Sequence, residues 1–221
     1  MKHDFKYISK HDPTVRQAYS NLNSLIREVQ LLVRDKYTFQ FYPIGSYVRN
    51  MITYDTKSNV GFDFDINIEP NDEGKTYSAK QLRKTFQDAL NQIAPKYGFD
   101  YPGESTRVLT IKVKDRKNSR IIYSCDFAIV NNYKDGDGYY CQEYIRFNKS
   151  HNSYGWYEQP DGYYMLPNKI EWTKESGLWG EVRERYIEKK DENNDPHIHS
   201  RTIFAQAVHE ICQKYGFYDE G

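Results

Sequence analysis

Three aspartates are the residues of this sequence whose type and spacing best fit catalytic chemistry. Asp63 and Asp65 lie two residues apart in a segment that alternates polar and apolar side chains, so both project from one face of a predicted strand. Asp126 lies in a later strand-like segment, between Cys125 and Phe127. If the two strands are neighbours in an antiparallel sheet, three carboxylates converge at one end of it. Carboxylate oxygens, completed by substrate phosphates and water, are the ligands that Mg²⁺ prefers.

A Gly-Ser pair precedes these carboxylates and is suited to phosphate binding. Gly45 and Ser46 follow a predicted strand over residues 38–44 and open a turn or short helix. Without a Cβ on the glycine, backbone N–H groups approach a phosphate closely, and a helix N-terminus favours negative charge. The alternative for Ser46 is an ordinary turn or helix cap, which is compatible with the phosphate role.

For the carboxylates, the alternative interpretation is a solvated strand face. Asn67 and Glu69 would continue such a face beyond Asp63 and Asp65. Asp is disfavoured in strands, however, and two carboxylates two residues apart repel each other when no cation lies near them. Asp126 has apolar neighbours, where an unpaired carboxylate is costly. We therefore favour a metal site over the solvated face.

The elements that must position these residues alternate between helices and strands. Asp12-Pro13 starts a long amphipathic helix that ends near Lys36, and Ser78 with Gln81 forms a capping box for a second helix. The order predicts an α/β (α+β) fold, with a mixed, largely antiparallel sheet backed by helices and a small helical part at the C-terminus. Strands are expected over residues 38–44, 62–69, 107–114 and 120–130, the last two as a hairpin, and further helices over residues 178–187 and after a Ser200 cap.

Two segments are expected to be irregular. Residues 50–61 are interpreted as an enlarged loop, and residues 131–176 as loop-rich, with short strands at 143–147 and 163–166. The expected domains are a catalytic core over residues 1–130, and a segment over residues 131–221 that forms the other wall of a cleft.

The composition excludes several classes of protein. The chain has 221 residues with 31 basic and 31 acidic side chains, so it lacks the basic excess that tight non-specific binding of nucleic acid needs. It has no apolar run long enough for a membrane span, no apolar leader and no P-loop motif. Three cysteines without zinc-site spacing indicate reduced thiols and a cytoplasmic protein.

These motifs, taken in order, resemble a known superfamily. Gly45-Ser46, then Asp63-Phe64-Asp65, then Asp126 resemble the polymerase-β-type nucleotidyltransferases. The stretches Ile44–Tyr47 and Gly61–Ile66 are similar to the branch that contains oligoadenylate synthases, cyclic GMP-AMP synthase-like proteins and bacterial cyclic-oligonucleotide synthases. Each motif alone is common, and their order on the expected elements carries the resemblance.

The resemblance, which covers roughly residues 15–130, implies transfer of a nucleoside monophosphate from an NTP such as ATP to a hydroxyl, with Mg²⁺ or Mn²⁺ as cofactor and pyrophosphate as product. It implies that Ser46 contacts the terminal phosphates and that Gly45 permits their approach. Asp63 and Asp65 would hold both metals, and Asp126 would ligate the catalytic metal and help to activate the acceptor hydroxyl.

Basic residues should assist the triphosphate. Arg49, just after the Gly-Ser turn, is one candidate, and Lys169 and Lys174 in the tail are others. The alternative for each is a solvated surface charge. The basic stretch from Arg107 to Arg120 would contact an RNA acceptor or, as we favour, form the exposed face of a hairpin.

The sequence leaves open both the identity of the acceptor and whether the protein is catalytically active. A nucleotide or short oligonucleotide is the favoured acceptor, and an RNA end, a small molecule and a protein hydroxyl are the alternatives. A catalytically silent nucleotide-binding regulatory module of the same fold, and a metal-dependent nuclease, are the other hypotheses. Eight of the 21 tyrosines lie between Tyr133 and Tyr164, and one or two of these rings are expected to stack on the nucleotide base.

Overall fold

The computed structural model describes residues 2–58, 60–72, 74–195 and 197–217. By its internal contacts the chain divides into two compact units. The sheet unit holds residues 7–53 and 59–158, and the helical unit holds residues 1–6, 54–58 and 159–221. The expected division at residue 130 falls inside β7 (Arg120–Lys134), which continues across it. That the segment after residue 130 forms the wall of a cleft stays a prediction.

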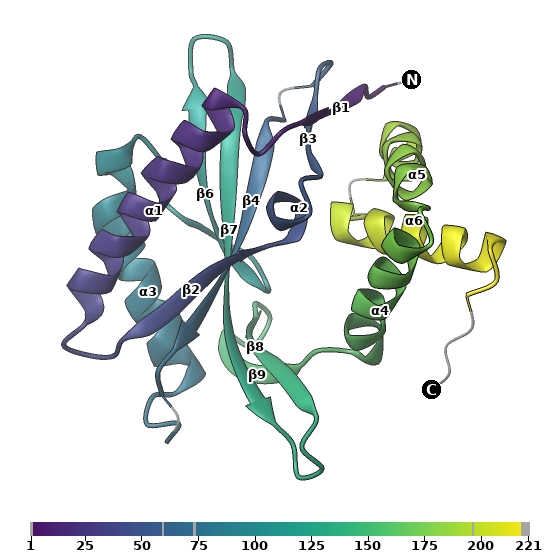
Figure 1. The fold of residues 1–221 in the computed structure, drawn as a ribbon. Coiled ribbons are helices and arrows are strands. Elements are labelled where there is room, and N and C mark those ends of the chain that lie inside the picture. The colour runs from purple at the N-terminus through teal and green to yellow at the C-terminus, as the bar shows by residue number, and fades with distance from the viewer. Residues whose placement is uncertain (1, 59, 73, 196, 218–221) are drawn as a thin grey trace. The chain divides into compact units, whose positions relative to one another are not determined.

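The sheet unit is built on a mixed sheet in which the strand order is β2-β4-β7-β6-β5, and a β8–β9 hairpin pairs with the end of β7 (Figure 1). Only β4 and β7 pair in parallel; the other pairs of this sheet, among the described residues, are antiparallel. The predicted fold class is therefore confirmed. The strands are β2 (Phe39–Ile44), β4 (Phe62–Pro70), β5 (Gly103–Glu104), β6 (Val108–Asp115), β8 (Tyr140–Asn148) and β9 (Ser153–Glu158).

The two acid-bearing strands, β4 and β7, are neighbours, but the expected antiparallel pairing is wrong. The chain between them forms a helix and the strands β5 and β6 before it returns. A crossover of this length brings the chain back to the same end of the sheet, so β7 runs parallel to β4. β6 then pairs with β7 as the predicted antiparallel hairpin.

Two helices cover one face of this sheet, α1 (Pro13–Val33) and α3 (Ala79–Ile93) (Figure 1). The Asp12 carboxylate caps α1 by accepting a 2.8 Å hydrogen bond from the Thr14 N–H, and the capping box of Ser78 and Gln81 starts α3 as predicted. Their apolar stripes pack on the side chains of alternate strand residues, such as Phe64 and Phe127, which are fully buried. The opposite side of β4 carries the polar residues Asp63, Asp65, Asn67 and Glu69.

The segment predicted to be loop-rich is mostly regular, and that prediction is wrong. Its first part forms the rest of β7 with β8 and β9, and β8 contains the short strand expected at residues 143–147. The strand expected at residues 163–166 lies instead in α4 (Asp161–Glu175). Tyr163 and Tyr164 favour strands, and Pro167 is unfavourable inside a helix. The local sequence therefore disfavours a helix here, and tertiary packing stabilises α4.

The loop expected at residues 50–61 contains β3 (Ile52–Asp55), which pairs with β1 (Phe5–Ile8) in a separate two-stranded sheet. The partner strand comes from the N-terminus, more than 40 residues away in the sequence, and such long-range pairing leaves no local signal.

The helical unit contains α4, α5 (Trp179–Glu192) and α6 (Ser200–Lys214). Ser200 is the first residue of α6 and does not cap it as expected, because the cap position falls on His199. None of the described helices has the length and apolar composition that crossing a bilayer requires.

The N-terminal residues of this unit are held by a buried carboxylate. The side chain of Asp55 is inaccessible to solvent, contacts the His3 ring at 2.6 Å and accepts hydrogen bonds from the N–H groups of Asp4 and Lys57, both at 3.0 Å. Burial would raise the pKa of Asp55, but the His3 ring and these N–H donors outweigh it and hold the pKa well below its usual range.

This depressed pKa predicts acid sensitivity. A carboxyl whose folded pKa lies below its unfolded value stabilises the fold above about pH 4, and this contribution is lost as the pH falls through the folded value. We expect Asp55→Asn to lower the free energy of unfolding at pH 7 by about 1–3 kcal/mol and to weaken the acid dependence. Urea unfolding between pH 2 and 7 checks this, with Glu175→Gln on the exposed surface of α4 as the control. Equal acid dependence in wild type and Asp55→Asn would contradict it.

Candidate active site

The Gly-Ser turn lies directly beside one of the carboxylates. Ile44, the last residue of β2, is the register partner of Asp65 on β4, and the chain then enters the short helix α2 (Gly45–Val48). Gly45 has a φ of +68°, in the left-handed region, and a Cβ at this position would overlap the Oδ2 atom of Asp65. Only glycine fits both the backbone and the close approach. Ser46 follows within the same turn.

The three aspartates lie on one face of two adjacent strands. In the parallel pairing of β4 and β7, Asp65 is opposite Asp126 and Asp63 is opposite Ser124. Side chains alternate along a strand, so these positions all face away from the helices that cover Phe64. The Ser124 hydroxyl donates to Asp63 Oδ1, and the Thr110 hydroxyl donates to Asp126 Oδ1 at 2.5 Å. The structure therefore brings together the carboxylates that the sequence singled out.

The three carboxylates affect the pKa of the Cys125 thiol. Cys125 lies on β7 between Ser124 and Asp126. Burial raises the pKa of Cys125 well above its usual value, and Asp126, Asp65 and Asp63 raise it further, in that order. The thiol is fully buried and stays protonated at neutral pH, so Cys125 is a packing residue and not a nucleophile.

The donor set fits a hard divalent cation, although the carboxylates do not converge on one point. In the described part of the chain, no three His, Cys, Asp or Glu side chains are arranged closely enough to hold a metal ion. Adjacent strands lie about 4.8 Å apart, so the register partners Asp65 and Asp126 are within reach of a shared ion. Carboxylate and hydroxyl oxygens are the ligands that Mg²⁺ prefers.

The predicted basic residues separate into two places. Arg49 directly follows α2, and its backbone N–H donates to the Gly45 carbonyl at 3.4 Å, so it belongs to the Gly-Ser turn. Lys169 lies on α4 in the helical unit, with its ammonium 6.0 Å from the centre of the Phe217 ring. Its role in nucleotide binding stays a prediction.

Two hydroxyl residues of the site escaped the sequence analysis. Thr110 and Ser124 hold Asp126 and Asp63 in place, and both are unremarkable strand residues in sequence. Thr110 could have been found from the predicted hairpin, because the register of β6 against β7 places Thr110 opposite Asp126. No local signal pointed to Ser124, whose partner is 61 residues away.

The close approach of Gly45 to Asp65 yields a prediction. We expect Gly45→Ala to displace the Asp65 carboxylate and to reduce nucleotide turnover by about 10²-fold, the usual consequence of a displacement near 1 Å. The added strain at positive φ should cost about 1 kcal/mol of stability. Steady-state kinetics and urea unfolding check both effects. Gly136→Ala is the matched control, because a Cβ there meets nothing within 4 Å; equal behaviour of the two variants would contradict the prediction.

Comparison with known proteins supports the fold at low sequence identity. No protein-family model and no curated sequence matches this chain. Its structure is similar to the CdnE cyclic dinucleotide synthase of Elizabethkingia meningoseptica, solved with GTP and Apcpp, with a TM-score of 0.55 and 14% identity over 91% of this chain and 70% of that one. It is equally similar to the CD-NTase CdnG of Bradyrhizobium diazoefficiens in complex with GTP, with a TM-score of 0.55 and 13% identity over 91% and 72%.

A third similar structure is the GTP-bound form of Vibrio cholerae DncV, with a TM-score of 0.54 and 16% identity over 90% of this chain. This chain spans about half of DncV, 51% of its length. The resemblance to the branch with bacterial cyclic-oligonucleotide synthases is thus confirmed for the fold: the chain has the nucleotidyltransferase fold of the CD-NTases.

Proposed function

We propose that this protein is a nucleotidyltransferase that moves a nucleoside monophosphate from an NTP to a hydroxyl acceptor. The observation that carries the proposal is the pairing of Asp65 with Asp126 on adjacent parallel strands, with Gly45 packed against the Asp65 carboxylate. An acidic strand face and a glycine turn thereby lie side by side, and this arrangement supports a metal-assisted phosphoryl transfer.

In this proposal each residue has a distinct role. The backbone of Gly45 and Ser46 receives the terminal phosphates of the NTP, and Arg49 adds positive charge at the same turn. Asp63 and Asp65 hold the divalent cations. Mg²⁺, or Mn²⁺ in its place, when bound there neutralises phosphate charge and lowers the pKa of the attacking hydroxyl.

Asp126 lies on the side of Asp65 that is remote from the Gly-Ser turn, so we assign it to the acceptor. The acceptor hydroxyl passes its proton to the Asp126 carboxylate, its oxygen bonds to the α-phosphorus, and the bond from that phosphorus to the bridging oxygen breaks to release pyrophosphate. The Thr110 hydroxyl donates to Asp126 Oδ1 and so fixes the orientation of this carboxylate beside Asp65.

A nucleotide or short oligonucleotide is the proposed acceptor. The similar structures were solved with GTP or with GTP and Apcpp, and two are named as CD-NTase or cyclic dinucleotide synthase. The equal numbers of acidic and basic side chains argue against a long nucleic acid.

The test is to incubate the protein with all four labelled NTPs and Mg²⁺ or Mn²⁺, followed by pyrophosphate assay and mass analysis of every product. We expect release of pyrophosphate and a product that contains an added nucleoside monophosphate. Calorimetry with ATP and GTP on the same preparation distinguishes the transferase from a silent nucleotide-binding module, because it measures binding without turnover. Nucleotide binding without any release of pyrophosphate would replace the proposal by a silent nucleotide-binding module.

A further inference from the structure

The Gly-Ser turn is too short to hold its own shape. α2 has four residues, and a single helical turn is not stable in water without support from its flanks. On the N-terminal side, this support is the pairing of Ile44 with Asp65 in the sheet. The C-terminal side of α2 must be fixed as well if the backbone of Gly45 and Ser46 is to be ordered before a phosphate binds.

Asn50 closes the turn on its C-terminal side with a left-handed backbone. Its φ is +52°, a conformation that glycine adopts freely and that asparagine tolerates better than most other residues. Such a residue ends a helix and satisfies its last carbonyls. Here the Asn50 N–H donates to the Tyr47 carbonyl at 3.2 Å. The next residue, Met51, donates its N–H to the Ser46 carbonyl at 2.8 Å.

The Asn50 side chain joins the turn to a distant part of the chain. Its Oδ1 atom accepts a hydrogen bond from the Lys10 N–H at 2.9 Å, across 40 residues of sequence. Lys10 lies between β1 and α1, and β1 pairs with β3, the strand that follows the turn (Figure 1). The end of the Gly-Ser turn is therefore bonded through one side-chain amide to the segment that leads into α1.

A second contact supports the middle of the turn. The Tyr47 ring stacks on the Tyr19 ring of α1, with centroids 4.3 Å apart, and meets the Phe64 ring edge-on at 5.5 Å. Phe64 lies on β4 between the first two aspartates. Tyr47 therefore packs the turn against the strand that carries the acids, and the C-terminal end of the turn depends on Asn50.

We propose that Asn50 is a positioning residue for the triphosphate of the NTP. It acts through the backbone of Gly45 and Ser46, which it holds in one conformation, and so lowers the entropic cost of binding the terminal phosphates. The inference rests on the proposed function, which assigns these phosphates to the Gly-Ser turn. Glycine at position 50 would keep the backbone conformation but lose the bond to Lys10, whereas alanine would also strain the backbone.

Two substitutions, Asn50→Gly and Asn50→Ala, test this role by calorimetry with Mg²⁺ and a non-hydrolysable NTP. We expect the Kd of the NTP to rise about 5-fold in Asn50→Gly, which loses one hydrogen bond, and at least about 10-fold in Asn50→Ala. The physical reason is that binding must then order the turn. In turnover, the KM of the NTP should rise by the same factors, while kcat at saturating NTP changes less than about 2-fold.

Asn152→Ala is the matched control. Asn152 is exposed in the turn between β8 and β9 and has a φ of +46°, so alanine there imposes a similar backbone strain. Both alanine variants should lower the melting temperature by about 2 °C or more, but Asn152→Ala should leave the Kd of the NTP unchanged. A loss of affinity that came from reduced stability alone would appear in both variants.

Two results would overturn the role of Asn50 and leave the transferase intact: Asn50→Gly binds the NTP as the wild type does, or Asn152→Ala weakens binding as much as Asn50→Ala. If the affinities fall as expected but the wild type releases no pyrophosphate, the transferase is refuted and the positioning role is supported. A wild type that binds no NTP would refute both. Asn50→Gly keeps the test decisive if Asn50→Ala does not fold.

Discussion

Replacement of Asp63 or Asp126 by alanine is expected to reduce NTP turnover at least about 10³-fold, a loss of about 4 kcal/mol of transition-state stabilisation. Asp63→Ala removes a carboxylate that we assign to the divalent cations, and Asp126→Ala removes the carboxylate that we assign to the acceptor hydroxyl. In neither variant can the remaining acids restore the lost charge. Release of labelled pyrophosphate under saturating NTP and Mg²⁺ measures the effect. Turnover of Asp63→Ala at the wild-type rate would show that the assignment is wrong.

The same variants should keep their fold, because these side chains face away from the apolar core. Three carboxylates on one face repel one another without a cation, so removing one is expected to leave the melting temperature equal or higher. Glu69→Gln is the matched control, since Glu69 lies on the same face of β4 and its Oε1 accepts from the Asn132 N–H at 3.2 Å. It should retain turnover.

A binding readout makes the metal assignment independent of activity. In the wild type, Mg²⁺ added together with a non-hydrolysable NTP should raise the melting temperature, since a ligand that binds only the folded state stabilises it. Asp63→Ala should lose most of this shift, whereas Glu69→Gln should keep it. A full shift in Asp63→Ala would place the cation elsewhere, whatever the variant's activity.

Replacement of Arg83 by methionine is expected to destabilise the sheet unit by about 3–5 kcal/mol, the cost of breaking a buried ion pair by removal of one partner. The variant leaves the Glu104 carboxylate, which is only 13% exposed, without its buried arginine, and it leaves three turn carbonyls without their donor. Burial lowers the pKa of Arg83, and Glu104 opposes that shift, so the guanidinium stays charged. Urea unfolding measures the loss.

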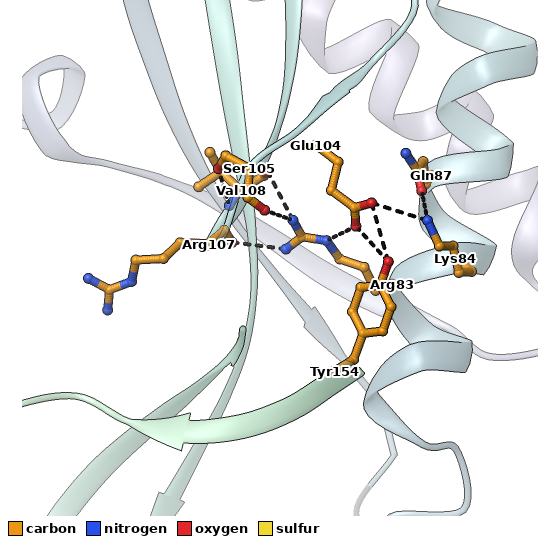
Figure 2. A network of polar contacts seen from close by, with 8 residues as sticks. All are labelled: Arg83, Lys84, Gln87, Glu104, Ser105, Arg107, Val108 and Tyr154. Carbon is orange, nitrogen blue, oxygen red and sulfur yellow. Dashed lines mark hydrogen bonds and ion pairs between the residues drawn. The ribbon is translucent and has the colours of Figure 1, made fainter. Parts of the chain in front are cut away.

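Control variants separate the buried pair from the rest of the network in Figure 2. Lys84 also contacts Glu104, at 3.1 Å, but is 41% exposed, so Lys84→Gln should cost at most about 1 kcal/mol. Tyr154→Phe removes a hydroxyl that bonds both Glu104 oxygens and should cost about 1 kcal/mol. If Arg83→Met does not fold, Arg83→Lys can be measured instead. It keeps the charge but loses the planar set of guanidinium N–H donors, so its free energy of unfolding should lie between those of the wild type and Arg83→Met. A cost for Arg83→Met no larger than that for Lys84→Gln would contradict the role of Arg83.

The local patterns of the chain were sufficient to predict the elements that carry the residues of the candidate site. The alternation from Phe62 to Glu69 placed Asp63 and Asp65 on one face of β4, and the capping box at Ser78 located the start of α3. These signals succeed because strand alternation and helix caps depend on residues only two to four positions apart. The same locality explains the errors: residues 163–166 were predicted as a strand where packing maintains α4, and β3 depends on a partner at the N-terminus.

Arg83 shows most clearly what a sequence pattern misses. It lies beside Leu82 and four residues from Gln87, and nothing in that sequence distinguishes it from a surface arginine. Its burial follows from acceptors supplied 21 to 25 residues later, at Glu104 and the turn into β6. A charged side chain is buried only where such partners exist, and partners of this kind are found through the fold.

The sequence by itself singled out the residues of the candidate site, because Gly45, Ser46 and the three aspartates stand out by type, order and alternation. The tertiary structure decided how they meet: β4 and β7 run parallel, Asp65 faces Asp126, and Gly45 packs against Asp65. It also added Thr110, Ser124 and Lys112 to the same face. The physical reason is that side-chain alternation is a property of each strand alone, whereas strand direction and register are set by the crossover and by core packing on α1 and α3.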